Sequence, residues 1–382
     1  MADDYARHAL SQRAAFEATH PAVLDAARLF AEEPVLRVAD LGAADGVNSH
    51  GLIRDLVAER AGRPLIYSLV DLPTNAWGVA FEHVRHAFGE AAGVVVIPAP
   101  GNTGSGVSGP GSDVHYTTAE ANGEACRRAV EQGPPPAAVI SMAGIPLQQA
   151  PCLPPGSVHV AVTGTAMHWI ADSGGLASTG SVFPGYPEHV DEAERRAWRV
   201  AAARQWEQLL ELRALELAPR GRFIAALPAS PVPCPERAGL YAELIATMNR
   251  MLADWRRAGR IGTATAAAVV VPVWMRTLEE IRAPFEDGGG SVAGLELESA
   301  ELFRLDNPYW DDDPARFARE YVRSVAAWGR PLLLRAFARE GEDRAPGLFA
   351  DFLQELEERV AHTPDRYRWD YIEALVICRK AD

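Results

Sequence analysis

The sequence predicts a doubly wound α/β fold, and three observations lead to this prediction. A short apolar run over 35–41 is followed by two glycines that are four residues apart. Apolar residues at helical spacing come next, which predicts a helix after the glycine turn. A second apolar strand over 65–70 then ends at an acid, Asp71. A strand, a glycine turn, a helix and a second strand ending at an acid form the opening of a doubly wound domain.

The later elements follow from the same patterns. Trp198, Trp206 and Leu209 lie at helical spacing and predict a long helix within 188–218. A segment over 98–113 is rich in glycine, serine and proline, which predicts a surface loop. Prolines are dense over 228–235, and the region 236–330 has the pattern of helices and loops. Further strands are predicted at 94–97, 138–142, 158–162, 223–227 and 372–377.

The chain has 382 residues, of which 48% are hydrophobic, so it can bury a large core. We expect one large domain with an inserted lobe rather than several independent domains. Residues 1–230 are predicted to form the core, and 231–330 a mainly α-helical cap. Residues 331–382 are predicted to return to the core with a terminal strand.

Charge and cysteine content exclude several classes of protein. The formal net charge is −14, from 37 basic and 51 acidic residues, which argues against a nucleic-acid partner. No signal peptide is evident, and the longest apolar run, 261–275, is too short to cross a membrane, so a cytoplasmic protein is expected. Neither a metal site nor a disulfide framework is expected, because the four cysteines are far apart: Cys126, Cys152, Cys234 and Cys378.

The first glycine turn suggests a ligand. A dinucleotide requires the spacing GxGxxG, whereas Gly42 and Gly46 are separated by three residues. S-adenosylmethionine carries no phosphate and tolerates the longer spacing, and an acid after the second strand suits its ribose hydroxyls. Asp71 occupies that position. The turn therefore favours this methyl donor over a dinucleotide, although two glycines also occur where they only shape a tight turn.

Several segments resemble the SABATH methyltransferases, the salicylic acid, benzoic acid and theobromine family. Ala39-Asp40-Leu41-Gly42 is similar to the family's ADLG, and Asp71-Leu72-Pro73 with Asn75 is similar to its NDLPGND signature. The resemblance extends over nearly the whole chain. Further similar segments are Tyr5-Ala6 with Gln12-Arg13, Gly144-Ile145-Pro146, Met167-His168-Trp169, Leu217 to Arg222, Pro331 to Leu334, and Arg379 to Asp382.

The resemblance implies a Rossmann-like class I methyltransferase core with a mostly parallel seven-stranded sheet and an inserted α-helical cap. It implies S-adenosyl-L-methionine as cofactor, S-adenosyl-L-homocysteine as product, a small carboxylic acid or azaheterocycle as substrate, and a homodimer. The donor would contact Tyr5, Asp40, Gly42, Asn48, Asp71, Leu72, Gln148 and Gln149. Gln12 and Trp169 would hold the acceptor carboxylate, and Tyr241 would line the pocket.

The sequence also departs from the family. Leu147-Gln148-Gln149 stands where the family has the GSF that contacts adenine, and Asp370 stands near a position that is commonly aromatic. The segment 98–113 has no counterpart in typical plant members. These differences predict a reshaped pocket, so the acceptor of a plant member does not transfer to this chain.

Each acceptor-side residue has an ordinary structural interpretation as well. Trp169 and Tyr241 are compatible with plain core positions, and Gln12 is compatible with the surface of an amphipathic helix. His168 is either a core histidine or a hydrogen-bond donor to the acceptor. An ionised carboxylate needs no general base to accept a methyl group, so neutral donors such as the Gln12 amide and the Trp169 indole suffice to orient it.

The predicted function is therefore carboxyl O-methylation of a small, aromatic acid by in-line transfer, with Gln12, His168 and Trp169 at the reacting end. Two alternatives remain open at this point. One is N-methylation of a small nitrogen heterocycle, which His168 beside Trp169 favours. The other is a binding protein that keeps the donor fold without activity. A dinucleotide-dependent oxidoreductase is disfavoured because GxGxxG is absent.

Overall fold

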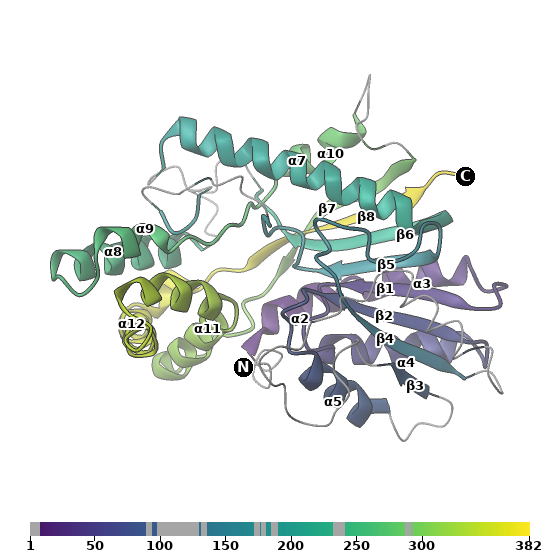
Figure 1. Cartoon of the computed structure of the whole chain (residues 1–382), viewed down its shortest axis with the longest axis horizontal. Coiled ribbons are helices and arrows are strands. Elements are labelled where there is room, and N and C mark those ends of the chain that lie inside the picture. Colours follow the sequence, from purple (N-terminus) through teal and green to yellow (C-terminus); the bar gives the residue numbers. More distant parts are fainter. Residues whose placement is uncertain are drawn as a thin grey trace.

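The computed structural model describes residues 8–88, 94–97, 130, 136–171, 176, 181–184, 190–231, 241–286, 292 and 294–382. Within these residues a large sheet carries helices on its faces, and a group of helices lies beside it (Figure 1). The predicted donor contact Tyr5 and the predicted loop over 98–113 lie outside the described residues. No helix in the described ranges combines the length and the apolar character needed to cross a membrane.

The sheet has eight strands in the described part of the chain, one more than the seven predicted. Their order is β3-β4-β2-β1-β5-β6-β8-β7, and all neighbours are parallel except that β8 runs antiparallel to β6 and β7. The strands are β1 (Leu36–Leu41), β2 (Leu65–Asp71), β3 (Val94–Ile97), β4 (Ala138–Gly144), β5 (Val158–Gly164), β6 (Leu217–Pro228), β7 (Leu295–Leu305) and β8 (Tyr371–Lys380).

Strand β7 is the additional strand, and it lies in the region expected to hold helices and loops. It occupies the edge of the sheet and pairs with β8. Its sequence alternates at first between apolar and acidic residues, with Leu295 buried and Glu296 exposed. This alternation is typical of a strand with one solvated face, and it lacks the continuous apolar run that marks the parallel strands.

The helices and short 3₁₀ turns separate into two sets, those on the sheet and those beside it. The first set is α2 (Leu10–Glu17), α3 (His20–Arg28), η2 (Val47–Ser49), α4 (His50–Glu59), α5 (Trp77–Phe88), α7 (Glu192–Glu216), α10 (Leu278–Arg282) and η4 (Ala283–Phe285). The second set is α8 (Ala242–Arg257), α9 (Thr263–Ala268), α11 (Pro314–Phe337), η5 (Ala338–Glu340), α12 (Ala345–His362) and η6 (Pro364–Tyr367).

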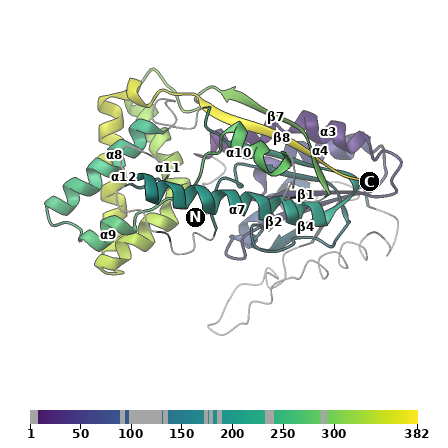
Figure 2. The ribbon, with the colours of Figure 1, turned by 90° about the horizontal axis from the view of Figure 1, so that it is seen from above.

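Alternate residues of the strands enter two apolar cores, one on each face of the sheet. On one face Val38 and Tyr67 pack with α3, α4 and α5. On the other face Ala39 and Phe223 pack with α7 and with Ile281 of α10. Figure 2 shows this layered arrangement from above. Because successive side chains of a strand point to opposite faces, the near-continuous burial of β1, β2, β4 and β5 follows from their position between two helical layers.

The helices α8, α9, α11 and α12, which we call the helical group, form a third core of their own. Trp255, Phe337 and Phe352 pack against one another there. Helix α11 continues through Pro331, where the predicted return to the core begins, and the chain rejoins the sheet at Tyr371. Figure 1 shows β8 running from the helical group into the sheet, beside the carboxyl end of β6.

Candidate functional site

The loop after β1 is folded tightly against β2 and β5. The N–H groups of Gly42 and Ala43 both donate to the carbonyl oxygen of Val70, at 2.7 and 3.1 Å. Gly42, Ala44 and Gly46 have positive φ angles of 88°, 50° and 74°. A Cβ atom added to Gly42 would lie 2.5 Å from the Cβ atom of Ala166, in the segment after β5. The glycine at this position is therefore required both by its backbone conformation and by a close neighbour.

Asp40 lies near the end of β1 with its carboxylate buried among hydroxyl groups. Ser49 and Tyr67 donate hydrogen bonds to its Oδ2 atom, at 2.5 and 3.2 Å. Burial raises the pKa of Asp40 to about 7, although both hydrogen bonds favour the ionised form. Asp40 therefore changes charge near neutral pH, and a cation bound beside it would hold it in the ionised form.

Asp71 connects the ends of β1 and β2. Its Oδ2 atom accepts a hydrogen bond from the Ala44 N–H at 2.7 Å, and its Oδ1 atom accepts one from the Leu72 N–H at 2.6 Å. Burial raises the pKa of Asp71, and the two backbone hydrogen bonds oppose this shift. Leu72 beside it is 46% exposed, which leaves an apolar surface next to the acid. Asn75 secures the same turn by donating to the Ala44 carbonyl oxygen at 2.5 Å.

The other predicted donor contacts lie around this loop. Asn48 belongs to η2, and its buried Oδ1 atom has no hydrogen-bond partner among the described residues. Gln148 and Gln149 follow β4, the first buried and the second exposed. This segment is attached to the end of β2, because the N–H of Ile145 donates to the carbonyl oxygen of Asp71 at 2.8 Å. The structure therefore gathers the described donor-side residues at the carboxyl ends of β1, β2 and β4, where open parallel sheets bind ligands.

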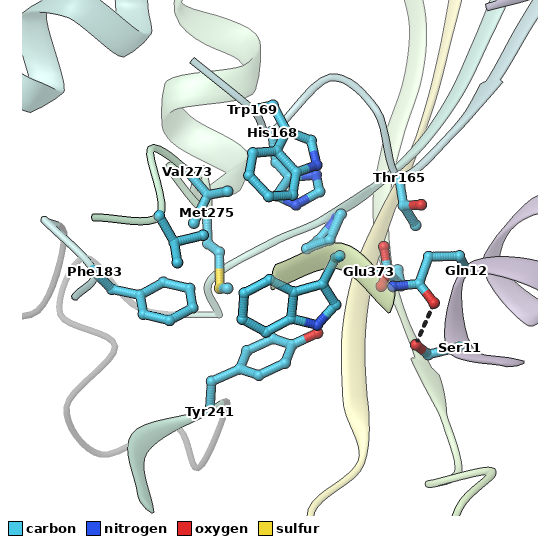
Figure 3. Close-up of a pocket in the computed structure, with 13 residues that line it drawn as sticks. Ser11, Gln12, Thr165, His168, Trp169, Phe183, Tyr241, Val273, Met275 and Glu373 are labelled. Carbon is cyan, nitrogen blue, oxygen red and sulfur yellow. Dashed lines mark hydrogen bonds between the residues drawn. The ribbon is translucent and has the colours of Figure 1, made fainter. Parts of the chain in front are cut away.

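A cavity lies between the carboxyl ends of the strands and the helical group. The centre of a water molecule can move within about 60 Å³ of this cavity. All four residues predicted for the acceptor side line it, and Figure 3 shows their side chains around a common space. The lining residues are Ser11, Gln12, Thr165, His168, Trp169, Phe183, Pro228, Tyr241, Val271, Val273, Met275, Trp328 and Glu373. Asp370, which stands at the commonly aromatic position, pairs instead with Arg304.

Gln12 is oriented by its neighbours on α2. The Ser11 hydroxyl donates to the Gln12 Oε1 atom at 3.0 Å, so the amide N–H₂ end is left to face the cavity. Tyr309 holds Ser11 in turn, because its hydroxyl accepts from the Ser11 N–H at 3.3 Å and donates to the His8 carbonyl oxygen at 2.8 Å. The network therefore presents Gln12 as a hydrogen-bond donor.

The backbone fixes His168 and Trp169 in place. Trp169 forms an antiparallel bridge with Val273, and the N–H of Trp274 donates to the His168 carbonyl oxygen at 2.9 Å. Gln205 of α7 also donates to the Trp169 carbonyl oxygen. These contacts attach the segment after β5 to the stretch between α9 and α10, so both rings are held at the cavity wall.

His168 is neutral at physiological pH. Burial, together with the nearby charge of Arg276, lowers its pKa to about 3. The buried Nδ1 atom of His168 has no hydrogen-bond partner among the described residues.

Tyr241 immediately precedes α8 and has a positive φ of 57°. Its ring lies near the rings of Phe183 and Tyr371, with centroids 6.4 and 5.7 Å away. Tyr241 is therefore both a core residue and a wall of the cavity.

Glu373 is a cavity residue that the sequence analysis did not identify. It lies in β8, is 2% exposed, and has a buried Oε2 atom without a hydrogen-bond partner in the described part of the chain. Burial raises its pKa well above the ordinary value. The available signal was an acid inside a strand that is otherwise apolar, Tyr371 to Cys378, because carboxyl groups are rarely buried without a reason.

The comparisons with known proteins bear on the fold. No family model matches the sequence, and no curated protein sequence matches it. The structure is similar to that of a loganic acid methyltransferase with S-adenosylhomocysteine, with a TM-score of 0.67, 15% identity, and coverage of 99% of this chain and 96% of that chain. A cyclopropane synthase, MmaA2 from Mycobacterium tuberculosis, matches at a TM-score of 0.36 and 10% identity, over 91% and 79% of the two chains. The first likeness extends over nearly all of both chains, and it shows that this chain has the fold of that methyltransferase.

Proposed function

We propose that the chain is an S-adenosylmethionine-dependent methyltransferase that converts a small carboxylic acid into its methyl ester. The observation that carries this proposal is the position of the segment after β5. Ala166 in this segment contacts Gly42 of the donor-side loop, whereas His168 and Trp169 line the cavity. One short segment therefore borders both places, which brings a donor on the loop and an acceptor in the cavity within reach of each other.

The donor-side residues fit the chemistry of the methyl donor. The Oδ1 atom of Asn48 has no partner among the described residues, and Asp40 becomes anionic beside a cation, so both suit an ammonium group. Asp71 retains lone pairs for ribose hydroxyls after accepting two backbone hydrogen bonds. The exposed side chain of Leu72 offers apolar surface for an adenine ring. The methyltransferase with this fold is solved with S-adenosylhomocysteine, which supports the same cofactor here.

The acceptor side suits an anion that needs no base. Gln12 presents its amide N–H₂ end, Trp169 carries an indole N–H, and His168 is neutral. S-adenosylmethionine, when bound, supplies a methyl group already activated by its sulfonium. The residues of this chain then have only to hold a carboxylate oxygen in line with that carbon and to exclude water. We further propose that the helical group acts as the cap of the acceptor pocket, because Trp328 of α11 and Tyr241 at the start of α8 form part of its wall.

The direct test supplies labelled methyl donor together with benzoate, indole-3-acetate and octanoate. A methyl ester of at least one acid is expected. Trp169→Phe is expected to lower kcat/KM by about 10- to 100-fold, the effect of losing a hydrogen bond to a charged group. Trp198→Phe is the matched control, because the Trp198 indole N–H is buried without a partner among the described residues and lies in another core. Equal activity of the two variants would contradict the assigned role of Trp169.

N-methylation of a small nitrogen heterocycle is the second candidate, and the unpartnered Nδ1 atom of neutral His168 favours it. Such an atom accepts a hydrogen bond from a ring N–H of the acceptor. The same assay with xanthine and theobromine, run over a range of pH, distinguishes N-methylation from ester formation. The rate of transfer to nitrogen falls steeply below the pKa of the accepting nitrogen, because its lone pair is then protonated.

The third alternative is a protein of this fold without enzymatic activity. Calorimetry with S-adenosylhomocysteine tests it, because absence of binding would contradict both methylation reactions.

A further inference from the structure

Glu373 is a buried carboxyl group in the acceptor cavity that no part of the proposed chemistry uses. Its backbone lies opposite Pro228 of β6 and Phe303 of β7, and neither side chain forms a hydrogen bond with it. No Lys or Arg is among the described residues that line the cavity with Glu373, and the Oε2 atom of Glu373 has no hydrogen-bond partner among them. Figure 3 shows its side chain on the same side of the cavity as Gln12.

Among the described residues that line the cavity, none is a cation that would stabilise an ionised Glu373. His168, from the segment after β5, is neutral because its pKa is about 3. Tyr241, which precedes α8, has a pKa raised well above its ordinary value, chiefly by burial, so it is not a cation or an anion at neutral pH. The remaining walls from α2, β6 and α11 carry Ser11, Gln12, Pro228 and Trp328, which do not titrate. Burial also raises the pKa of Glu373 well above its ordinary value, which favours the neutral acid.

We propose that Glu373, as a neutral carboxylic acid, donates a hydrogen bond to the acceptor carboxylate and makes the pocket selective for anionic acceptors. This inference rests on the proposed function and names the group that recognises the charge of its substrate. A hydrogen bond from an acid O–H to a carboxylate is among the stronger ones in proteins. Two carboxyl groups that share a site do not both ionise, so the bound anion itself keeps the proton on Glu373.

The proton stays on Glu373 throughout. The carboxylate oxygen that forms the new bond to the methyl carbon carries no proton, and the electron pair of the broken carbon–sulfur bond goes to sulfur. Glu373 thus joins Gln12 and Trp169 as a neutral donor. No Lys or Arg is among the described residues that line the cavity, so no cationic side chain there forms an ion pair that would reduce the nucleophilicity of the carboxylate.

The first experiment measures kcat/KM for the best acid of the panel from pH 6 to 10. The wild-type value is expected to fall about tenfold per pH unit above the pKa of Glu373, where ionised Glu373 repels the acceptor. Glu373→Gln keeps a neutral donor, so we expect activity within threefold of the wild type at pH 7 and no such fall. Glu373→Ala is expected to lose 10- to 100-fold at pH 7. Asp370→Asn is the matched control, because Asp370 precedes the same strand but pairs with Arg304 outside the cavity lining.

The second experiment needs no catalysis. Benzoate is titrated into protein saturated with S-adenosylhomocysteine, in two buffers of different ionisation enthalpy, about one pH unit above the midpoint of the alkaline fall found in the first experiment. Binding is expected to take up protons in the wild type and none in Glu373→Gln. Proton uptake without any ester product would contradict carboxyl methylation and leave the role of Glu373 intact.

Three results would overturn the inference while the proposed function stands. One is ester formation with the same alkaline fall in Glu373→Gln as in the wild type. Another is equal loss of activity in Glu373→Gln and Glu373→Ala at pH 7, which would mean that a neutral hydrogen-bond donor at this position is not what the pocket needs. The third is failure of Glu373→Gln to fold, seen by circular dichroism and S-adenosylhomocysteine binding, because a neutral isostere replaces a neutral acid without that cost.

Discussion

Gly42 and Gly62 have nearly the same positive φ angle and very different surroundings. Their φ angles are 88° and 90°. A Cβ atom on Gly42 would meet the Cβ atom of Ala166 at 2.5 Å, whereas nothing lies within 4 Å of one on Gly62. The pair therefore separates the cost of a left-handed backbone from the cost of crowding at the junction between donor loop and acceptor cavity.

Gly62→Ala is expected to lower the free energy of unfolding by about 1–2 kcal/mol, from backbone strain alone. Gly42→Ala is expected to cost about 1–3 kcal/mol more, because overpacking adds to the strain. It is also expected to weaken S-adenosylhomocysteine binding at least tenfold, whereas Gly62→Ala leaves the affinity unchanged. Urea unfolding and calorimetry measure the two quantities. Equal effects of the two substitutions on affinity would show that the contact with Ala166 does not shape the donor site.

At the residue scale, what could be predicted depended on whether a residue belonged to a recognisable motif. Gln12, His168, Trp169 and Tyr241 come from three separate segments, and the resemblance to a family placed them in one pocket. Composition and spacing alone allowed an ordinary core or surface interpretation for each. Glu373 belongs to no motif, and its position in the cavity depends on how β8 pairs with β6, which the sequence does not express locally.

The segment that carries Gln148 and Gln149 is supported by a buried ion pair on α7. The Arg213 Nε atom lies 2.8 Å from the Glu216 Oε2 atom, and the two side chains are 0% and 1% exposed. Arg213 also donates to the Leu147 carbonyl oxygen at 3.3 Å, and the N–H of Cys152 donates to Glu216. Helix α7 thereby fixes both ends of the segment.

Arg213→Met is expected to destabilise the protein by about 3–5 kcal/mol, because it leaves Glu216 buried and uncompensated. It is also expected to weaken S-adenosylhomocysteine binding by loosening the segment. The double variant Arg213→Met with Glu216→Leu is expected to regain most of the stability, since it removes both charges. Thermal unfolding measures these changes. Arg28→Met is the control, because the ion pairs of Arg28 are exposed and their loss is expected to have no measurable effect.

If Arg213→Met and Arg28→Met had the same unfolding temperature, this explanation of the role of the α7 ion pair would be contradicted.

At the scale of elements, the parallel strands were predicted closely, whereas the antiparallel edge strand β7 was not predicted. The apolar runs over 65–70, 94–97 and 138–142 lie within β2, β3 and β4. β7 was missed because half of an edge strand is solvated and its acids resemble those of a helix or loop. β6 begins at Leu217, inside the range predicted for the helix and ahead of the strand predicted over 223–227, and its pairing with β5 shifts register between Val158 and Val160. Such irregular pairing is a tertiary effect that local patterns do not report.

The whole molecule carries a net charge of −14, and the proposed reaction brings two ligands of opposite charge to it. S-adenosylmethionine has a net positive charge, whereas a carboxylate acceptor is negative. Long-range attraction and repulsion are screened by salt. Raising the ionic strength from 10 to 300 mM is therefore expected to raise the KM of the donor and lower the KM of the acceptor, each by roughly threefold.

Initial-rate kinetics at several salt concentrations measure the two KM values. S-adenosylhomocysteine is the internal control, because its net charge is zero and its dissociation constant is expected to change little with salt. Movement of both KM values in the same direction would mean that local groups, rather than the field of the whole protein, control the approach of the ligands.

The position of β8 has a consequence for how the protein is made. β8 lies between β6 and β7 in the sheet but follows both along the chain. During synthesis β6 therefore has one unpaired edge until β8 emerges from the ribosome, and an unpaired edge is prone to join other chains. Glu373 arrives on the same strand. A nascent chain that lacks β8 thus has its donor loop but an incomplete sheet, and its acceptor cavity lacks Glu373. Aggregation through the unpaired edge of β6 is therefore expected to compete with folding until β8 inserts.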